Sequence, residues 1–145
     1  MDHATELPQR LGDLLASLNR ENLEAVLPNL LALYDEAMVF RDPIQELRGK
    51  PAFEHMNRSL AARSRAFHFE LLDRAGDDAR AFLRWRMVMQ PKLGRTMEVE
   101  GTSFLRANDA GLVVEHVDYW DLPSFFASAV PGGERMLRAL LKPIA

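Results

Sequence analysis

The residues best suited to chemistry lie close together near the end of the chain, where His116 and Asp118 stand two positions apart. The segment from Leu112 to Trp120 is rich in β-branched and aromatic residues and is soon followed by Pro123, which is typical of a β-strand. Because side chains alternate along a strand, we expect one face to carry Leu112, Val114, His116, Asp118 and Trp120. That face begins apolar and ends with groups that are costly to bury unpaired, so we expect a polar pocket here.

A carboxylate and an imidazole can transfer protons, and Asp42, just before Pro43, adds a second carboxylate from a distant part of the chain. Such a set can remove a proton from a carbon acid and return it elsewhere without a cofactor. We therefore predict that Asp42, His116 and Asp118 are catalytic. The residues predicted to bind substrate, or to donate hydrogen bonds to it, are Tyr34, Phe53, Met56, Trp85 and Trp120.

Purely structural roles are the alternatives for these residues. Asp42 would then only accept hydrogen bonds in the turn at Pro43, and His116 would be a buried histidine paired to Asp118 or to a carbonyl. The two tryptophans would belong to the core. The sequence leaves these alternatives open.

Composition narrows the class of protein. The chain has 145 residues, which suits one domain, and its 48% hydrophobic and 27% charged residues are typical of globular proteins. The net charge of −3 does not fit a nucleic-acid binder. There is no cysteine, and the histidines other than His116 fall on separate segments, so we expect no metal site. Without a signal peptide or a run of about 18 apolar residues, we expect a cytoplasmic protein without a membrane span.

Apolar spacing predicts the elements that position these groups. Helical spacing predicts helices over residues 7–18 and 23–31, and a third that begins at Gly49-Lys50-Pro51. Alternation with period two predicts strands over residues 37–41, 67–72, 80–89, 95–106 and 112–120. Helices followed by a meander of strands indicate an α+β domain with helices on one face of a curved sheet.

Charge predicts the register of the hairpin formed by residues 80–89 and 95–106. Opposite charges should face each other on one side and apolar groups on the other. The pairs that satisfy this are Arg86 with Glu98, Arg84 with Glu100, Trp85 with Val99, and Met87 with Met97. We expect these charged residues to be structural, each exposed pair contributing about 0–1 kcal/mol.

Two stretches resemble a known superfamily. Residues 34–43 with 48–53 resemble the opening half of the ketosteroid isomerase and SnoaL-like group, and residues 111–121 are similar to its last strand. On this resemblance, which covers approximately residues 7–122, the chain is identified as a SnoaL-like, ketosteroid isomerase-like protein of the nuclear-transport-factor-like superfamily. The resemblance implies a cone-shaped α+β barrel, with a curved antiparallel sheet and the N-terminal helices packed on its concave face around a pocket. It also implies a homodimer through the outer face of the sheet.

The resemblance implies roles for two carboxylates. Asp42 stands where the ketosteroid isomerases carry the base that removes a proton. Glu115-His116 followed by Asp121 resembles the acidic site of the SnoaL-like polyketide cyclases. Alternation instead places Asp118 beside His116, with Asp121 on the other face unless the strand bulges, so both acids remain candidates.

These observations predict a cofactor-independent acid/base enzyme of the isomerase, cyclase or dehydratase type. Its substrate would be a small apolar molecule, ring-containing or polyketide-like. The alternative is a non-catalytic module of the same fold that binds a small ligand or forms dimers. We expect residues 1–122 to form the domain and residues 123–145 to form a helical extension packed on it.

Overall fold

The structure is a computed structural model that describes residues 6–142, and this part contains five helices and six strands. The helices are α1 (Leu7–Ser17), α2 (Leu23–Leu31), α3 (Lys50–Arg63), α4 (Leu122–Ala129) and α5 (Gly133–Leu141). The strands are β1 (Tyr34–Arg41), β2 (Glu46–Arg48), β3 (Ser64–Gly76), β4 (Arg80–Pro91), β5 (Met97–Ala107) and β6 (Val113–Trp120). Only the short strand β2 has no counterpart among the predicted strands. Residues 1–5 and 143–145, at the two ends of the predicted domain and extension, lie outside the described part.

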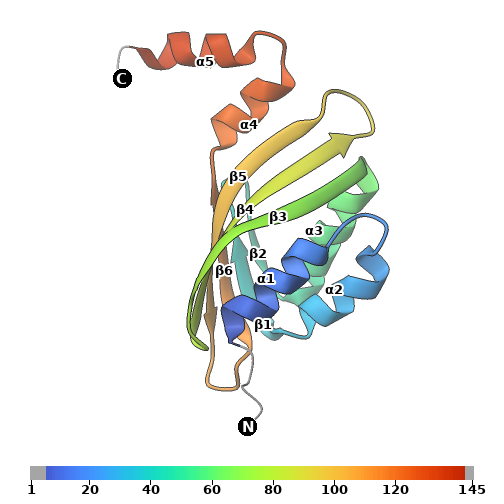
Figure 1. The fold of residues 1–145 in the computed structure, drawn as a ribbon, viewed down its shortest axis with the longest axis vertical. Coiled ribbons are helices and arrows are strands. Elements are labelled where there is room, and N and C mark those ends of the chain that lie inside the picture. Colours follow the sequence, from blue (N-terminus) through green and yellow to red (C-terminus); the bar gives the residue numbers. More distant parts are fainter. Residues whose placement is uncertain (1–5, 143–145) are drawn as a thin grey trace.

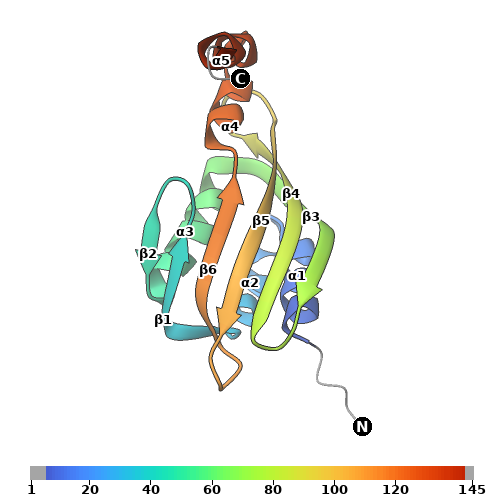
Figure 2. The same cartoon turned by 90° about the vertical axis from the view of Figure 1, so that its left-hand side faces the viewer.

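The six strands form one curved sheet in the order β2-β1-β6-β5-β4-β3, and helices α1, α2 and α3 cover its concave face (Figures 1 and 2). The predicted α+β architecture is confirmed, although the sheet is not closed into a barrel. Neighbouring strands are antiparallel except β1 and β6, which are parallel. The expectation of an antiparallel sheet is wrong at this pair. The chain between β1 and β6 contains a helix and four strands, and so long a connection allows parallel pairing that a hairpin would forbid.

The hairpin of β4 and β5 is shifted by two residues from the predicted register. Trp85 lies opposite Gly101, not opposite Val99. A β-carbon at residue 101 would come within 2.5 Å of the Trp85 indole, so a glycine is needed for the ring to lie across β5. The predicted register is therefore wrong, because it ignored the size of the group that faces the tryptophan.

The ion pairs used for that prediction form despite the shift. Arg86 lies opposite Glu100 and contacts it at 2.7 Å, and it also contacts Glu98 at 3.0 Å. Arg84 contacts Glu100 at 3.1 Å. Long arginine side chains reach a diagonal partner as well as a directly opposite one, and a shift of two residues keeps every side chain on its face. Charge alone therefore could not distinguish the two registers.

A β-bulge at the start of β6 changes which side chains face the helices. At one step of the pairing with β5 the partner on β6 advances from Val113 to Glu115, so Val114 is an extra residue. Val113 is fully buried and takes the inward position that alternation assigned to Val114. The predicted inward placement of Val114 is wrong for this reason, and Leu112 lies before the strand begins. Beyond the bulge alternation holds, and the inward side chains are His116, Asp118 and Trp120.

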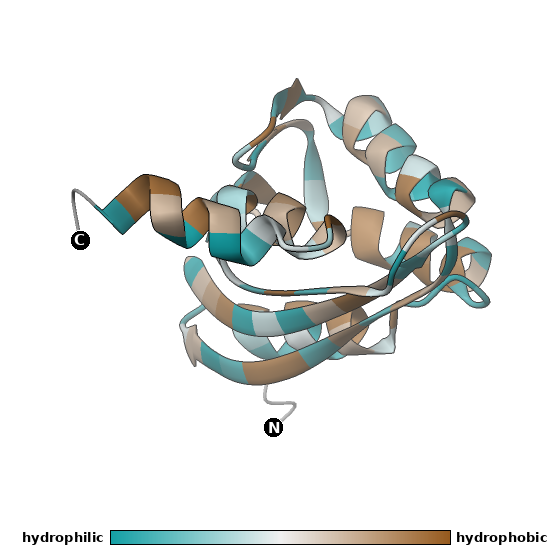
Figure 3. Ribbon diagram, turned by 90° about the horizontal axis from the view of Figure 1, so that it is seen from above, coloured by the Kyte–Doolittle hydropathy of each residue, from teal (hydrophilic) through white to brown (hydrophobic). Residues whose placement is uncertain are grey.

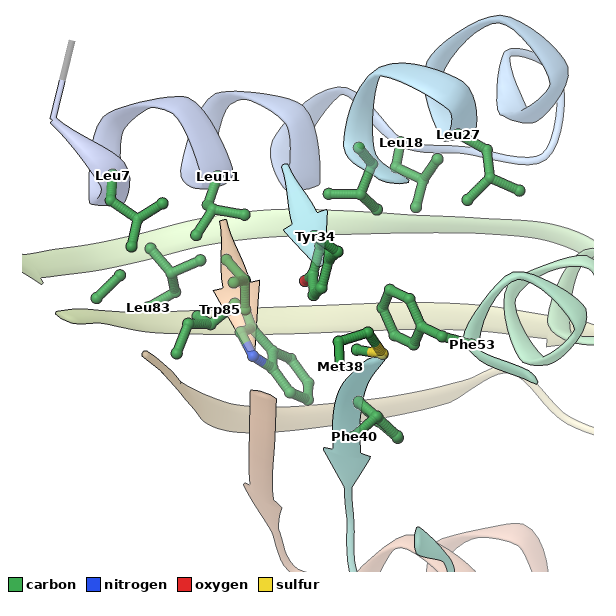
Figure 4. Packing of buried hydrophobic residues seen from close by; sticks show 14 of the residues in the cluster. Leu7, Leu11, Leu18, Leu27, Tyr34, Met38, Phe40, Phe53, Leu83 and Trp85 are labelled. Atoms are coloured by element: carbon green, nitrogen blue, oxygen red, sulfur yellow. The ribbon is translucent and has the colours of Figure 1, made fainter. Parts of the chain in front are cut away.

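Buried side chains fill the space between the sheet and the helices (Figure 4). The helices contribute Leu7, Leu11, Leu27 and Phe53, Leu18 follows the end of α1, and the sheet contributes Tyr34, Met38, Phe40, Leu83 and Trp85. Burying each large apolar side chain contributes roughly 1.5–3 kcal/mol. The inward-facing polar groups of β6 therefore lie against an apolar layer.

The two C-terminal helices extend beyond the end of the sheet (Figures 1 and 2). Phe125 of α4 packs edge-on against Trp120, with ring centres 5.4 Å apart. Helix α5 packs on α4 and carries both apolar and polar residues (Figure 3), and its Met136 and Leu140 are exposed. That residues 123–145 form a unit packed on the domain stays a prediction.

We predict that Gly101→Ala lowers the free energy of unfolding by about 1–3 kcal/mol, because the new methyl group overlaps the Trp85 ring. Urea unfolding followed by far-ultraviolet circular dichroism measures the loss. The control is the same change in a Trp85→Phe background, since phenylalanine lacks the two ring atoms that the methyl group would meet. The cost should be smaller there, because only the 3.0 Å contact of the methyl group with the Tyr119 carbonyl oxygen remains, and an equal cost in both backgrounds would contradict the role assigned to Gly101.

Candidate active site

The candidate site is centred on a hydrogen bond between His116 and Asp118 on β6. His116 Nε2 lies 2.8 Å from Asp118 Oδ1, and the two side chains are 13% and 19% exposed. They stand two positions apart, so the alternation of the strand places both on the face that meets the helices. The pair is mostly buried but remains open to solvent on one side.

The second ring nitrogen of His116 contacts Tyr34 at the start of β1. The Tyr34 hydroxyl lies 2.8 Å from His116 Nδ1, across 82 positions in the sequence. Parallel pairing of β1 with β6 brings the two residues together. The rings of Phe40 and Phe53 lie 5.0 and 5.7 Å from the imidazole, centre to centre. These apolar surroundings strengthen the hydrogen bonds of the imidazole.

Ser103 of β5 holds the Asp118 carboxylate directly, and Trp85 of β4 holds Ser103. The Ser103 hydroxyl donates to Asp118 Oδ1 over 2.5 Å, and the Trp85 indole N–H donates to Ser103 Oγ over 2.8 Å. Both donors are almost fully buried. Ser103 lies directly opposite Asp118 on the neighbouring strand. Sequence reasoning missed Ser103, because a serine at an inward strand position becomes a signal only once the register is known.

The donors and acceptors fix the direction of this chain of hydrogen bonds. An indole N–H only donates and an ionised carboxylate only accepts, so Asp118 receives the Ser103 hydroxyl and the His116 Nε2–H. The neutral imidazole then offers Nδ1 as an acceptor to the Tyr34 hydroxyl. Every donor in the chain is directed towards Asp118. The arrangement therefore stabilises one negative charge within an apolar layer.

Asp42 directly follows β1, one residue beyond the last pair of the parallel register, which joins Arg41 to Val117. Asp42 Oδ1 accepts hydrogen bonds from two backbone N–H groups of the turn that follows, at 2.7 and 2.9 Å. Asp42 thus closes the turn, and its role beside Asp118 stays a prediction.

Asp121 lies apart from this cluster. It is exposed and caps the N-terminus of α4, accepting hydrogen bonds from the Ser124 N–H at 3.0 Å and the Ser124 hydroxyl at 2.6 Å. These bonds hold the pKa of Asp121 below its ordinary value. Of the two acids that the sequence left open, the structure brings Asp118 to His116 and places Asp121 at a helix end.

The other residues predicted to bind substrate lie in different parts of the structure, and one of them contacts the cluster. Phe53 is buried beside the imidazole. The thioether of Met56 accepts a hydrogen bond from the side-chain amide of Gln45, which also lies 3.4 Å from Asp42. Trp120 packs against α4. The structure therefore brings Phe53 to the cluster, and it places Met56 near the Asp42 turn and Trp120 beside the C-terminal helices.

A cavity of about 600 Å³ lies at the C-terminal helices. It is lined by Ser124, Glu134, Leu137, Arg138, Leu141 and Lys142. None of these residues belongs to the His116 cluster. The pocket expected on the concave face of the sheet therefore stays a prediction.

Residues 6–142 contain neither a metal-binding cluster nor a membrane-spanning helix. This part of the chain holds no group of three His, Asp or Glu side chains that could bind a metal ion. It also contains no helix of the length and apolar character needed to cross a membrane.

The fold defines the class of protein, which is that of the NTF2-like proteins. An NTF2-like protein of unknown function from Exiguobacterium sp. 255-15 superposes with a TM-score of 0.66 at 19% identity, covering 78% of this chain and 96% of that one. An LEH-like epoxide hydrolase of Mycobacterium tuberculosis has a TM-score of 0.63 at 16% identity, covering 92% and 91%. A second M. tuberculosis protein, solved in complex with estradiol-17β-hemisuccinate, has a TM-score of 0.61 at 20% identity, covering 79% and 95%. At these identities the likeness shows the fold alone.

The family follows from the sequence. The family model for the SnoaL-like domain matches residues 11–116, which is more than half of the chain, so the chain belongs to the SnoaL-like family. The predicted superfamily is confirmed. No curated protein matches the sequence. The family match ends at His116, so Asp118 and the C-terminal helices lie beyond it.

We predict that the Tyr34 phenol stays protonated far into the alkaline range. Burial raises the pKa of Tyr34 well above its ordinary value, and the Asp118 charge raises it further. A pKa raised in the folded state means that the contribution to stability is complete below about pH 10, the unfolded value, and is lost as pH rises towards the folded value. In a Tyr119→Phe variant Tyr34 is the remaining tyrosine, and ultraviolet titration should show it ionising together with alkaline unfolding. Reversible ionisation near pH 10 with native circular dichroism would refute this.

Proposed function

We propose that this protein is a cofactor-independent acid/base enzyme of the isomerase, cyclase or dehydratase type. Its substrate is a small apolar molecule, ring-containing or polyketide-like, and its reaction is a proton transfer at carbon. The observation that carries the proposal is the Asp118 carboxylate, held by two hydrogen bonds and partly exposed at an apolar layer. A carboxylate fixed in this way meets a carbon-bound proton without reorganising.

The reaction balances without an oxidant or a reductant. A carboxylate oxygen forms an O–H bond as the C–H bond of the substrate breaks, and the electron pair moves into an enolate. Return of the proton to another atom of the substrate gives an isomer. In a cyclisation the enolate carbon bonds to a carbonyl carbon of the same molecule, and the proton goes to the resulting alkoxide oxygen, whereas loss of a neighbouring hydroxyl as water gives a dehydration. The candidates for these two proton transfers are Asp42, His116 and Asp118.

The substrate class is supported by the surroundings and by the neighbouring structures. Phe40, Phe53 and Tyr34 present aromatic rings around the imidazole. One protein of the same fold was solved with an estradiol derivative, and another is an epoxide hydrolase. The steroid bound by the first supports a ring-containing ligand for this chain as well.

We predict that the protein accelerates the ring opening of 5-nitrobenzisoxazole, an apolar ring compound that opens when a carbon-bound proton is removed. Asp118→Asn should lower kcat by about 10²–10⁴, because an amide cannot accept the proton. Asp42→Asn and His116→Ala should abolish most of the turnover while the protein still folds. The amide oxygen in Asp42→Asn can keep both hydrogen bonds of the turn. Absorbance of the phenolate product measures the rate.

The matched control is Asp78→Asn, the same chemical change at an exposed turn. It should turn over the probe at the wild-type rate. A wild-type rate equal to the background reaction would refute the acid/base proposal, as would unchanged rates in Asp42→Asn, His116→Ala and Asp118→Asn.

The alternative, a module that binds a small ligand without chemistry, has one observation in its favour. Every buried side-chain N or O atom within residues 6–142 has a hydrogen-bond partner, which is what a purely structural cluster requires. This alternative would give a retained apolar ligand in native mass spectrometry of the purified protein together with no turnover of the probe.

We also propose a homodimer through the outer face of the sheet. Phe82 and Tyr119 are exposed on this face, and the Phe82 ring packs against Phe104 at 5.2 Å. Exposed aromatic side chains are enriched at protein–protein interfaces.

We predict that the wild type sediments as a dimer in analytical ultracentrifugation. A Phe82→Glu/Tyr119→Glu variant should sediment as a monomer, because the new charges would be desolvated in the interface. Leu93→Glu, at an exposed apolar residue of the β4–β5 loop, is the control and should remain dimeric. A monomeric wild type would refute the dimer.

A further inference from the structure

The two oxygens of the Asp118 carboxylate have different surroundings. Oδ1 accepts hydrogen bonds from the Ser103 hydroxyl and from His116 Nε2. Within residues 6–142, Oδ2 receives no hydrogen bond, and no buried side-chain oxygen of this part lacks a partner, so Oδ2 keeps some exposure to solvent on a side chain that is 19% exposed. The carboxylate thus has one oxygen held by the protein and one that is open.

His116, in contrast, has no open ring nitrogen. Nδ1 contacts the Tyr34 hydroxyl and Nε2 contacts Asp118, each at 2.8 Å. A substrate proton could reach either nitrogen only after one of these hydrogen bonds had broken. The imidazole is therefore placed to orient the carboxylate and is not placed to act as the base.

The direction in which Asp118 Oδ2 points is set by Ser103 and Trp85, because they hold the other carboxylate oxygen. Ser103 and Trp85 are buried, and the Trp85 indole occupies one acceptor position of the Ser103 oxygen. The hydroxyl hydrogen is consequently left to point at Asp118 Oδ1. Because Trp85 can lie there only over Gly101, the backbone of β5 fixes this orientation.

We propose that Asp118 Oδ2 is the proton-accepting atom of the site and that Ser103, directed by Trp85, is the residue that positions the carboxylate. This inference rests on the proposed acid/base function. In the step, the substrate C–H bond breaks and an Oδ2–H bond forms, while the electron pair stays on the substrate. His116 and Ser103 are positioning residues, because they hold Oδ1 and take no proton from the substrate.

The experiment compares kcat and KM for 5-nitrobenzisoxazole in the wild type and in two Ser103 variants. Ser103→Ala removes the charge-assisted hydrogen bond that orients the carboxylate, so kcat should fall by about tenfold or more with KM unchanged. Ser103→Cys keeps nearly the same volume but donates only weakly, so kcat should fall by less. Thr102→Ala removes a hydroxyl from the other face of β5 and should leave both constants unchanged.

Long-range ¹H–¹⁵N spectra of the wild type show which ring nitrogen of His116 carries the proton, and this result does not depend on activity. The inference requires the Nε2–H tautomer. An Nδ1–H tautomer overturns the inference. Unchanged kcat in both Ser103 variants, when Asp118→Asn has lost activity, also overturns it and leaves the proposed function standing. Absence of turnover by the wild type overturns the proposed function and this inference with it.

Discussion

The contact between the Trp85 indole and the bare backbone of Gly101 determines much of this structure. It permits a register of β4 and β5 in which the largest side chain lies across the smallest residue. In that register the indole N–H reaches Ser103, and Ser103 faces Asp118 across β5 and β6. A steric fit within one hairpin therefore sets the orientation of a carboxylate two strands away. Any change at residue 101 acts on the polar cluster and on the core together.

The second constraint is the desolvation of the polar groups that β6 directs towards the helices. Leaving a buried donor or acceptor unpaired costs about 1–3 kcal/mol, so a carboxylate and an imidazole persist in an apolar layer only when their partners are supplied. The parallel pairing of β1 with β6 supplies Tyr34 to one side of His116, and β5 supplies Ser103 to Asp118. The β5–β6 hairpin and strand β1, which is distant from it in sequence, thus satisfy together a cluster that no single hairpin could complete.

Local patterns predicted the helices, most of the strands and the inward face shared by His116 and Asp118, because each depends on spacing within a single element. These local patterns gave wrong predictions where the register or the facing residue depends on two elements at once. Registers two residues apart place charges on the same faces, so the charge pattern around Arg86 fitted both. The bulge at Val114 and the position of Ser103 opposite Asp118 arise from pairing between strands, and no spacing within either strand encodes them.

The location of that bulge also separates the two acids near the end of β6. Asp121 could share a face with His116 only if the strand contained an extra residue between them. The extra residue instead lies before His116, so alternation continues unbroken to Trp120. Asp121 then falls at the start of α4, where two hydrogen bonds from Ser124 engage it. Unbroken alternation after His116 thus leaves Asp118 as the acid next to it, which is why the proposed chemistry is assigned to Asp118.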